Sequence, residues 1–309
     1  MRRYGLLCMA LIMTLLLPAA AIAEKPAMQK GFPVETPTAP EEIVPTLLPI
    51  DFTGGMPVNS KFYADDRLSY SDPTITVSIE SGRYENCDWW AARIKISDAS
   101  QLRTGSAGGF DSNMTMNGPA LARRLNAILA VDGDYYCFSN RGYIKRQGTV
   151  FWSNISGYED MLFIDDKGDF HIARNAKQED VDRMESEYRI INCLTFGPAL
   201  VLDGKLITDY TMVTNRKASE PRQRMCIAQV GELEYLCVCS ASAARGSYGL
   251  DLYQFSSLVA SFGVQNAYNL DGGDSTIMVF GGEKINDIRN PDTRQISDIV
   301  YFASGYKPE

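Results

Sequence analysis

The sequence contains a single histidine, His171, among its 309 residues. Catalytic schemes that need an imidazole base, such as a Ser-His-Asp triad, are therefore almost entirely excluded, and so are metal sites built from several imidazoles. His171 falls in a segment that we expect to be a hairpin strand, where an ordinary strand residue is the favoured interpretation. Carboxylates remain as the groups for proton transfer, and arginines remain as the groups that hold an anion.

Closely spaced cysteine pairs of the zinc-binding kind are also missing. Because the sequence has no Cys-x-x-Cys motif, a structural zinc site is disfavoured. One of the seven cysteines lies near the N-terminus, and the even number that remains permits disulfides outside the cytosol without fixing their pairing. These remaining cysteines are Cys87, Cys137, Cys193, Cys226, Cys237 and Cys239.

Positive charge is in deficit. The chain has 30 Lys and Arg residues against 38 Asp and Glu residues, a formal net charge of −8, so nucleic acid and anionic membrane surfaces are poor candidates for partners. The apolar content of 45% and the charged content of 22% are ordinary for a globular protein. The length suffices for one large domain or two small ones, with an ample core.

Residues 1–23 have the features of an export signal. Arg2 and Arg3 precede an apolar run at residues 6–17 that is too short to span a bilayer comfortably, and residues 21–23 match an A-x-A cleavage signature. We therefore predict a cleaved signal peptide and a secreted or cell-envelope protein. The alternative is an uncleaved N-terminal anchor, which would be the chain's only expected contact with a membrane.

The rest of the chain divides into a linker and one domain. Residues 24–58 are rich in proline, which blocks helices and central strands, so we predict an extended linker there. Residues 59–309 are predicted to form a single domain, and no internal repeat is visible in them.

Within this domain the predicted strands outnumber the predicted helices, which indicates an α+β fold: one mixed, strand-rich domain with a few helices packed on the sheet. Helices are expected from Pro119 onward, over residues 177–189 and over residues 251–262. Strands are expected at 74–79, 89–96, 128–131, 161–164, 170–173, 194–202, 225–230, 233–239 and 299–302.

The most informative segment is the polar corner at residues 269–276, Asn-Leu-Asp-Gly-Gly-Asp-Ser-Thr, which lies between two apolar segments. A β-hairpin turn is the simple interpretation, because Asp-Gly and Gly-Gly are common hairpin turns. The run of polar and small residues is longer than such a turn needs, so we favour a functional site that includes Asp271 and Asp274. Without a histidine to activate it, Ser275 is expected to donate a hydrogen bond and not to act as a nucleophile.

A second acidic corner follows the predicted strand at 128–131. Asp132 precedes a glycine, so turn chemistry is a serious alternative to function for this residue. Asp134 is followed by Tyr135 and Tyr136, and aromatic rings beside a carboxylate suit a sugar-binding surface, although either tyrosine could equally be a core residue.

Three arginines are candidates for binding an anion. Arg222 and Arg224 directly precede a predicted strand, and Arg294 precedes the last one. A guanidinium binds a phosphate in a bidentate manner, but each arginine alone could be a surface residue or half of an ion pair. Gly197 could allow a close approach of the backbone to a substrate, and a bend or bulge explains it at least as well.

Several of these segments, taken in their order along the chain, match the motifs of one known family. Over roughly residues 60–303 they resemble the phosphodiester glycosidase family in its exported bacterial form. The matching segments are Val131-Asp132-Gly133-Asp134-Tyr135-Tyr136, Phe196-Gly197-Pro198-Ala199-Leu200-Val201 with Asp203-Gly204-Lys205, Arg224-Met225-Cys226-Ile227-Ala228-Gln229, Gly249-Leu250 with the helix after it, the corner at 269–276 with Met278, and Arg294 with the strand after it. The chain departs from the family pattern at Asp132, Ala228 and Asp274, and residues 240–245 lack the family's usual Asp-Gly-Arg.

The resemblance implies hydrolysis of a sugar-1-phosphodiester with release of the sugar. On this hypothesis Asp134 and Asp271 are the working carboxylates, and Arg224 and Arg294 hold the phosphate. Asp274 would assist or bind Ca²⁺ or Mg²⁺, a possible cation rather than a required cofactor. Further substrate contacts are assigned to the N–H groups of Gly272 and Gly273 and to Ser275, Asn269, Tyr135 and Gly197.

Two other functions stay open at this stage. The chain could be a non-catalytic module of the cell envelope that binds a glycan, or a phosphodiesterase that cuts the P–O bond instead of the glycosidic bond.

Overall fold

The computed structural model describes residues 46–139, 141–210, 218–242, 247–287 and 294–307. Thr38–Glu309 form one compact unit, and the described residues all lie in it. The predicted signal peptide, residues 24–45 of the predicted linker and part of the loop at 240–245 lie outside the described residues.

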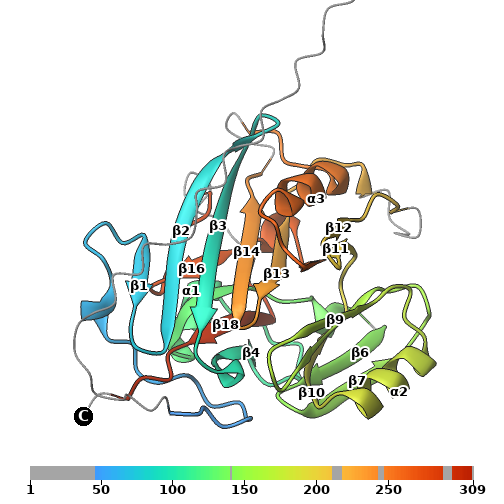
Figure 1. The fold of residues 1–309 in the computed structure, drawn as a ribbon, viewed down its shortest axis with the longest axis horizontal. Coiled ribbons are helices and arrows are strands. Elements are labelled where there is room, and N and C mark those ends of the chain that lie inside the picture. The colour runs from blue at the N-terminus through green and yellow to red at the C-terminus, as the bar shows by residue number, and fades with distance from the viewer. Residues whose placement is uncertain (1–45, 140, 211–217, 243–246, 288–293, 308–309) are drawn as a thin grey trace, which may run out of the picture. The chain divides into compact units, whose positions relative to one another are not determined.

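The described strands form three antiparallel sheets (Figure 1). The largest has the order β1 (Ser69–Ser71), β2 (Ile75–Tyr84), β3 (Cys87–Ile96), β14 (Glu234–Ser240), β13 (Met225–Gly231), β15 (Asn266–Asn269), β11 (Ala199–Leu202) and β12 (Lys205–Leu206). The second has the order β7 (Thr149–Asn154), β6 (Gly142–Arg146), β10 (Ile190–Leu194), β8 (Met161–Asp165) and β9 (Phe170–Ala173). The third has the order β17 (Glu283–Lys284), β16 (Met278–Phe280), β5 (Ala127–Asp132), β18 (Asp298–Ala303) and β4 (Leu102–Ser106).

Each sheet has one face in a shared core and the other covered by a helix. The central core receives alternate residues of several strands, among them Ile94, Leu129, Leu162, Ile227 and Val300. The helices α1 (Gly118–Arg124), α2 (Gln178–Glu187) and α3 (Leu252–Ala260) pack on the outer faces of the third, second and first sheets respectively. The predicted α+β class is therefore confirmed.

Local sequence signals explain where the helices begin. The Asn117 side chain accepts the N–H of Ala120, and the Asp251 side chain accepts the N–H of Gln254 in a capping box. No helix among the described residues has both the length and the apolar character needed to cross a membrane.

His171 and the cysteines have structural surroundings. His171 lies in β9, where its Nε2 atom is 3.0 Å from Asp165 Oδ2 and its ring stacks on Tyr188, so its interpretation as a strand residue is confirmed. All six cysteines of the described chain are free thiols.

One expectation about strands was wrong, and the structure also excludes the hairpin alternative at residues 269–276. Residues 194–202 form two strands in different sheets, because Gly197 has a φ of +67° and Pro198 has no N–H for a ladder. Residues 269–276 join β15 of the first sheet to β16 of the third. The simple hairpin interpretation of this corner is therefore excluded.

The described part of the predicted linker is bonded to the domain. The Thr46 N–H donates to Gly305 O, and the Gly55 N–H donates to Leu125 O. The Arg103 side chain, which is 1% exposed, donates to the carbonyl oxygens of Pro49, Asp51 and Thr53 at 3.0 Å each. One buried guanidinium thus holds this segment against the third sheet.

We expect Arg103→Ala to lower the free energy of unfolding by about 3 kcal/mol, because it leaves several buried carbonyl groups without donors. Urea unfolding measures this change, and limited proteolysis should show faster cleavage within residues 46–55. Arg93→Ala is the control: it removes an exposed pair with Glu80 and should cost less than about 1 kcal/mol. Equal effects of the two changes would contradict the assigned role of Arg103.

Candidate active site

A pocket lies where the corner at 269–276 crosses from the first sheet to the third. On the first sheet the Leu270 N–H donates to Met225 O at 2.8 Å. On the third sheet the Asp271 N–H donates to Gly133 O at 3.0 Å, directly after β5. Two adjacent residues near the start of the corner are thus bonded to different sheets, which fixes the backbone of the corner at the pocket.

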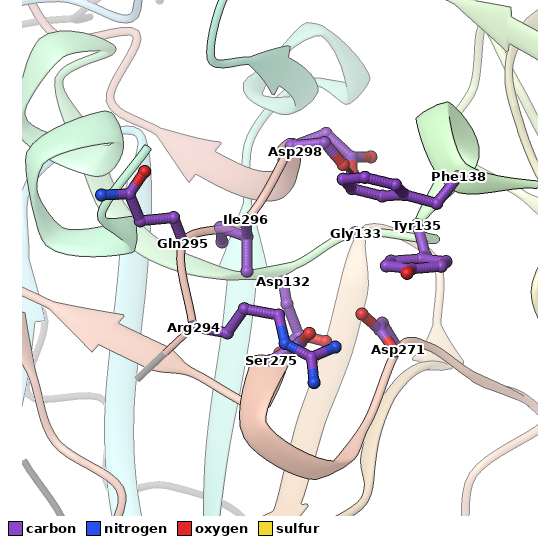
Figure 2. A pocket seen from close by; sticks show the side chains of 11 residues that line it. Asp132, Gly133, Tyr135, Phe138, Asp271, Ser275, Arg294, Gln295, Ile296 and Asp298 are labelled. Carbon is purple, nitrogen blue, oxygen red and sulfur yellow. Dashed lines mark hydrogen bonds between the residues drawn. The ribbon is translucent and has the colours of Figure 1, made fainter. Parts of the chain in front are cut away.

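The pocket combines carboxyl groups with one guanidinium and two aromatic rings (Figure 2). The groups used in the argument below are the carboxyl groups of Asp132, Asp271 and Asp298, the guanidinium of Arg294, the hydroxyls of Ser275 and Ser297, and the rings of Tyr135 and Phe138.

Asp271 lies in the wall of this pocket, as predicted. Its Oδ1 atom accepts the N–H of Gly272 at 2.7 Å. Burial raises the pKa of Asp271, while the Ser275 hydroxyl, the Gly272 N–H and the charge of Arg294 oppose that rise. The ionised form of this carboxyl group is therefore stabilised by groups of the same pocket.

Asp132 and Asp298 are almost completely buried, at 1% exposure each. Asp132 Oδ1 accepts the Ile277 N–H at 2.8 Å, and Asp298 Oδ1 accepts the Ser297 hydroxyl at 2.9 Å. The Oδ2 atoms of both have no hydrogen-bond partner among the described residues. These two oxygens are thus buried acceptors without a donor in the described part of the chain.

The surroundings of these two carboxyl groups favour their neutral forms. Burial, with the charge of Asp271 next in size, raises the pKa of Asp132 well above its usual range. Burial and the charge of Asp134 raise the pKa of Asp298 to about 7, against the opposing charge of Arg146. In this pocket burial thus works against ionisation of both carboxyl groups.

Sequence reasoning did not find Asp298, and it gave Asp132 a serious alternative as a turn residue. The pairing of β18 with β5 brings them together, since Ile299 lies opposite Asp132 and the Gly133 N–H donates to Asp298 O at 3.1 Å. The one local signal for Asp298 is its position at the start of the last strand, after Arg294.

Asp134 is not part of the pocket lining, in contrast to its predicted catalytic role. Its Oδ2 atom accepts the Thr195 N–H at 2.7 Å, and its Oδ1 atom lies 2.7 Å from Arg146 Nη2. The carboxylate is fully occupied in a buried ion pair behind the pocket, so we assign it a supporting role.

Arg224 also lies away from the pocket. Its Nε and Nη2 atoms donate to the backbone oxygens of Leu250 and Glu220, and burial lowers its pKa to about 10. The structure therefore does not place this guanidinium where it would hold a phosphate of the pocket's ligand. Its neighbour Gln223 supports the corner instead, because Gln223 O accepts the Gly273 N–H at 3.0 Å.

The glycines of the corner serve close packing and do not present free N–H groups. The Gly272 N–H is bonded to Asp271 and the Gly273 N–H to Gln223. A Cβ atom at position 272 would lie 2.8 Å from Gln223 O, which explains why glycine is needed there. The predicted N–H contacts of these two residues with a phosphate are therefore not seen.

The remaining predicted contacts divide into two groups. Ser275 and Tyr135 line the pocket, where Tyr135 stacks on Phe138 with 4.6 Å between ring centroids. Asn269 and Gly197 lie away from it, joined by a hydrogen bond of 2.8 Å from Asn269 Nδ2 to Gly197 O. This bond links the start of the corner to the chain before β11.

Arg294 and Asp274 form an ion pair of 3.6 Å at the pocket mouth, where their side chains are 51% and 76% exposed. A divalent cation at Asp274 does not fit these surroundings, because a guanidinium lies beside the carboxylate. In the described ranges, no group of three or more His, Cys, Asp and Glu side chains is arranged to hold a metal ion. We assign no step of the chemistry to a cation.

The geometry predicts a strong effect of Gly133→Ala. The new Cβ atom would lie 2.0 Å from Asp298 Oδ2 in a buried site, so we expect a loss of about 2 kcal/mol of stability and a displaced Asp298 carboxyl group. Thermal unfolding measures the first effect. Gly231→Ala, whose Cβ would have an ordinary contact at 3.8 Å, is the control and should change stability by less than about 0.5 kcal/mol. Similar melting temperatures for the two variants would contradict the close approach.

Comparisons with known proteins add to this geometry. The chain is similar to the zebrafish N-acetylglucosamine-1-phosphodiester alpha-N-acetylglucosaminidase catalytic domain, auto-inhibited by its pro-peptide, with a TM-score of 0.62 and 16% identity over 76% of this chain and 85% of that one. It is also similar to a hypothetical protein from Synechocystis, with a TM-score of 0.52 and 15% identity over 74% of this chain and 62% of that one. At these identities the two likenesses show the fold alone.

The comparison with curated proteins found no match. The model of one protein family matches residues 125–303, a segment that contains the whole pocket lining and more than half of the chain. The chain therefore belongs to the phosphodiester glycosidase family.

Proposed function

We propose that this protein hydrolyses the glycosidic bond of a sugar-1-phosphodiester, releasing the free sugar and leaving a phosphomonoester. One observation carries the proposal: two buried carboxyl groups, the partly buried carboxyl group of Asp271 and a half-exposed guanidinium face a single pocket at the corner that links two sheets. Family membership and the zebrafish enzyme's name support this reaction class.

Arg294 would bind the phosphate, because it is the guanidinium in the pocket lining and its side chain is open to solvent. A phosphomonoester is a good leaving group, so recognition of the anion matters more than protonation of the departing oxygen. Asp271 would stabilise the positive charge that develops on the sugar. Asp132 and Asp298 would supply the proton-carrying carboxyl groups.

The sugar would lie against Tyr135 and Phe138, whose stacked rings border the carboxyl groups (Figure 2). Phe138 is 53% exposed, so its ring is accessible to a ligand. We propose export through residues 1–23, which makes a glycan of the cell wall or an exopolysaccharide the expected source of substrate.

A non-catalytic glycan-binding module is the second candidate. It is favoured by the occupied N–H groups of Gly272 and Gly273 and by the position of Arg224, since these leave fewer groups for a transition state. The aromatic rings would serve either function.

The deciding experiment is hydrolysis of a panel of synthetic sugar-1-phosphodiesters by residues 24–309, with and without a chelator. Release of sugar and phosphomonoester would establish the glycosidase, and oxygen-18 from water in the sugar would exclude cleavage of the P–O bond. Loss of activity with chelator would show a cation requirement. Retention of a glycan without turnover of any substrate would favour the binding module.

Asp271→Asn should lower kcat by about 1000-fold, because it removes the carboxylate that faces the reacting carbon. The rate of sugar release measures this loss. Asp182→Asn, a change to an exposed carboxylate on α2 that contacts the Gln178 side chain, serves as the control and should leave kcat unchanged. Retained turnover in Asp271→Asn would refute the assignment.

Arg294→Met should raise KM for a phosphodiester by about tenfold to a hundredfold, since a charged hydrogen bond to the phosphate contributes about 1.5–3 kcal/mol. Arg294→Lys should recover part of the loss because it keeps the charge without the bidentate geometry. Equal KM values for the Met variant and the wild type would show that another group holds the phosphate.

A further inference from the structure

Arg146 is a fully buried cation directly behind the pocket. It is the last residue of β6 and has 0% exposure. Its Nη2 atom lies 2.7 Å from Asp134 Oδ1 and 3.8 Å from Asp298 Oδ2. The rings of Phe110 and Tyr136 lie 5.4 and 5.9 Å from its guanidinium carbon, so the side chain is fixed on several sides.

The two carboxylates do not share this charge equally. Asp134 has the shorter ion pair and also accepts the Thr195 N–H, so its charge is well compensated. Asp298 has the longer contact and one hydroxyl donor, Ser297. Of the two, only Asp298 lines the pocket. The less compensated carboxyl group is thus the one that a ligand would meet.

We propose that Arg146 is a positioning residue of this site: it holds the Asp298 carboxyl group at the pocket wall and supplies the buried positive charge that allows this group to ionise. The inference rests on the proposed function, since it concerns how the same pocket handles a proton.

The other groups around Asp298 act in different directions. The Ser297 hydroxyl donates a hydrogen bond that favours the ionised form of Asp298, while the charge of Asp134 opposes it. Asp132 at the end of β5 is a buried carboxyl group whose own pKa is raised. Tyr136 and Cys137, in the turn after β5, have pKa values raised by burial, with the charge of Asp298 adding to the rise, and so stay protonated near neutral pH. Among the described residues, Arg146 is the one cation that forms an ion pair with Asp134 or Asp298.

Gly133 provides the space that this arrangement needs. A side chain at position 133 would overlap the Asp298 carboxyl group, while the Gly133 N–H fixes the Asp298 backbone. The Asp298 carboxyl group is therefore confined between the backbone of Gly133, directly after β5, and the guanidinium of Arg146. Contacts on two sides thus fix the position of this carboxyl group.

Two substitutions should move the same titration in opposite directions. Arg146→Lys retains a positive charge for Asp134 but brings less positive charge close to Asp298. The apparent pKa of the limb that Asp298 produces in the kcat–pH profile should therefore rise by about one unit. Asp134→Asn removes a competing negative charge, so that limb should fall by about one unit. The limb is measured in kcat against pH, and Asp298→Asn identifies it by abolishing it.

The matched control is Lys145→Gln. Lys145 precedes Arg146 in β6 but pairs with Glu185, so its loss should leave the limb in place. Carbon-13 NMR of the Asp298 carboxyl carbon follows the same titration without substrate, so an Arg146→Lys variant with very low activity would still give a result.

Opposite shifts in the two variants would support the proposal. The proposal would be overturned if the variants had a lower melting temperature and lower activity while the pH limb and the NMR titration stayed where they are in the wild type. That outcome is expected if Arg146 is only a structural residue. Should Arg146→Lys fail to fold, the double variant Arg146→Lys/Asp134→Asn decides: a limb above that of Asp134→Asn supports the proposal, and an equal limb overturns it. A wild type that cleaves no phosphodiester would refute the proposed function separately, and the NMR titration would then show whether Arg146 controls Asp298.

Discussion

The geometry of the site depends on the backbone N–H and C=O groups of Gly133. Its N–H donates to Asp298 O and its carbonyl oxygen accepts the Asp271 N–H, so one residue ties β5, β18 and the corner together. These three segments carry the three carboxyl groups of the pocket. No side chain is compatible with this position, because the Asp298 carboxyl group occupies the place of a Cβ atom. Backbone pairing thus determines where the three carboxyl groups of the site lie.

Backbone pairing also explains which parts of the site could be read from the sequence. Asp271, Arg294, Ser275 and Tyr135 belong to conspicuous local motifs, and each lies in the pocket lining as expected. Arg146 has no local signal, and Asp298 has only its position at the start of the last strand. Their roles come from the position of β6 beside Asp134 and from the pairing of β18 with β5. Strand pairing between distant segments is not encoded in the periodicity of either segment.

Two charged residues of the predicted site do not line the pocket. Asp134 and Arg224 occur in the right motifs, but each is directed into the protein, toward Arg146 and toward backbone carbonyls respectively. In a continuous strand Asp132 and Asp134 would lie on the same side, but β5 ends at Asp132 and the chain turns at Tyr135, where φ is +61°, so the spacing within the motif does not specify which carboxyl group faces the pocket. The fold class needed less information, because alternating apolar residues indicate strands whatever their partners. The break at Gly197 and Pro198 is the exception, where an apolar run crosses from one sheet to another.

Burial of the carboxyl groups resolves a difficulty in the proposed chemistry. A protein with a formal charge of −8 and three carboxyl groups in one pocket would repel a phosphodiester if all three were ionised. Burial raises the pKa of Asp132 well above its usual range and that of Asp298 to about 7, so much of this negative charge is absent near neutral pH. Arg294 then faces mainly Asp271 within the pocket and the exposed Asp274 at its mouth. The low exposure that makes these carboxyl groups suitable for proton transfer is therefore also what makes the pocket accessible to an anion.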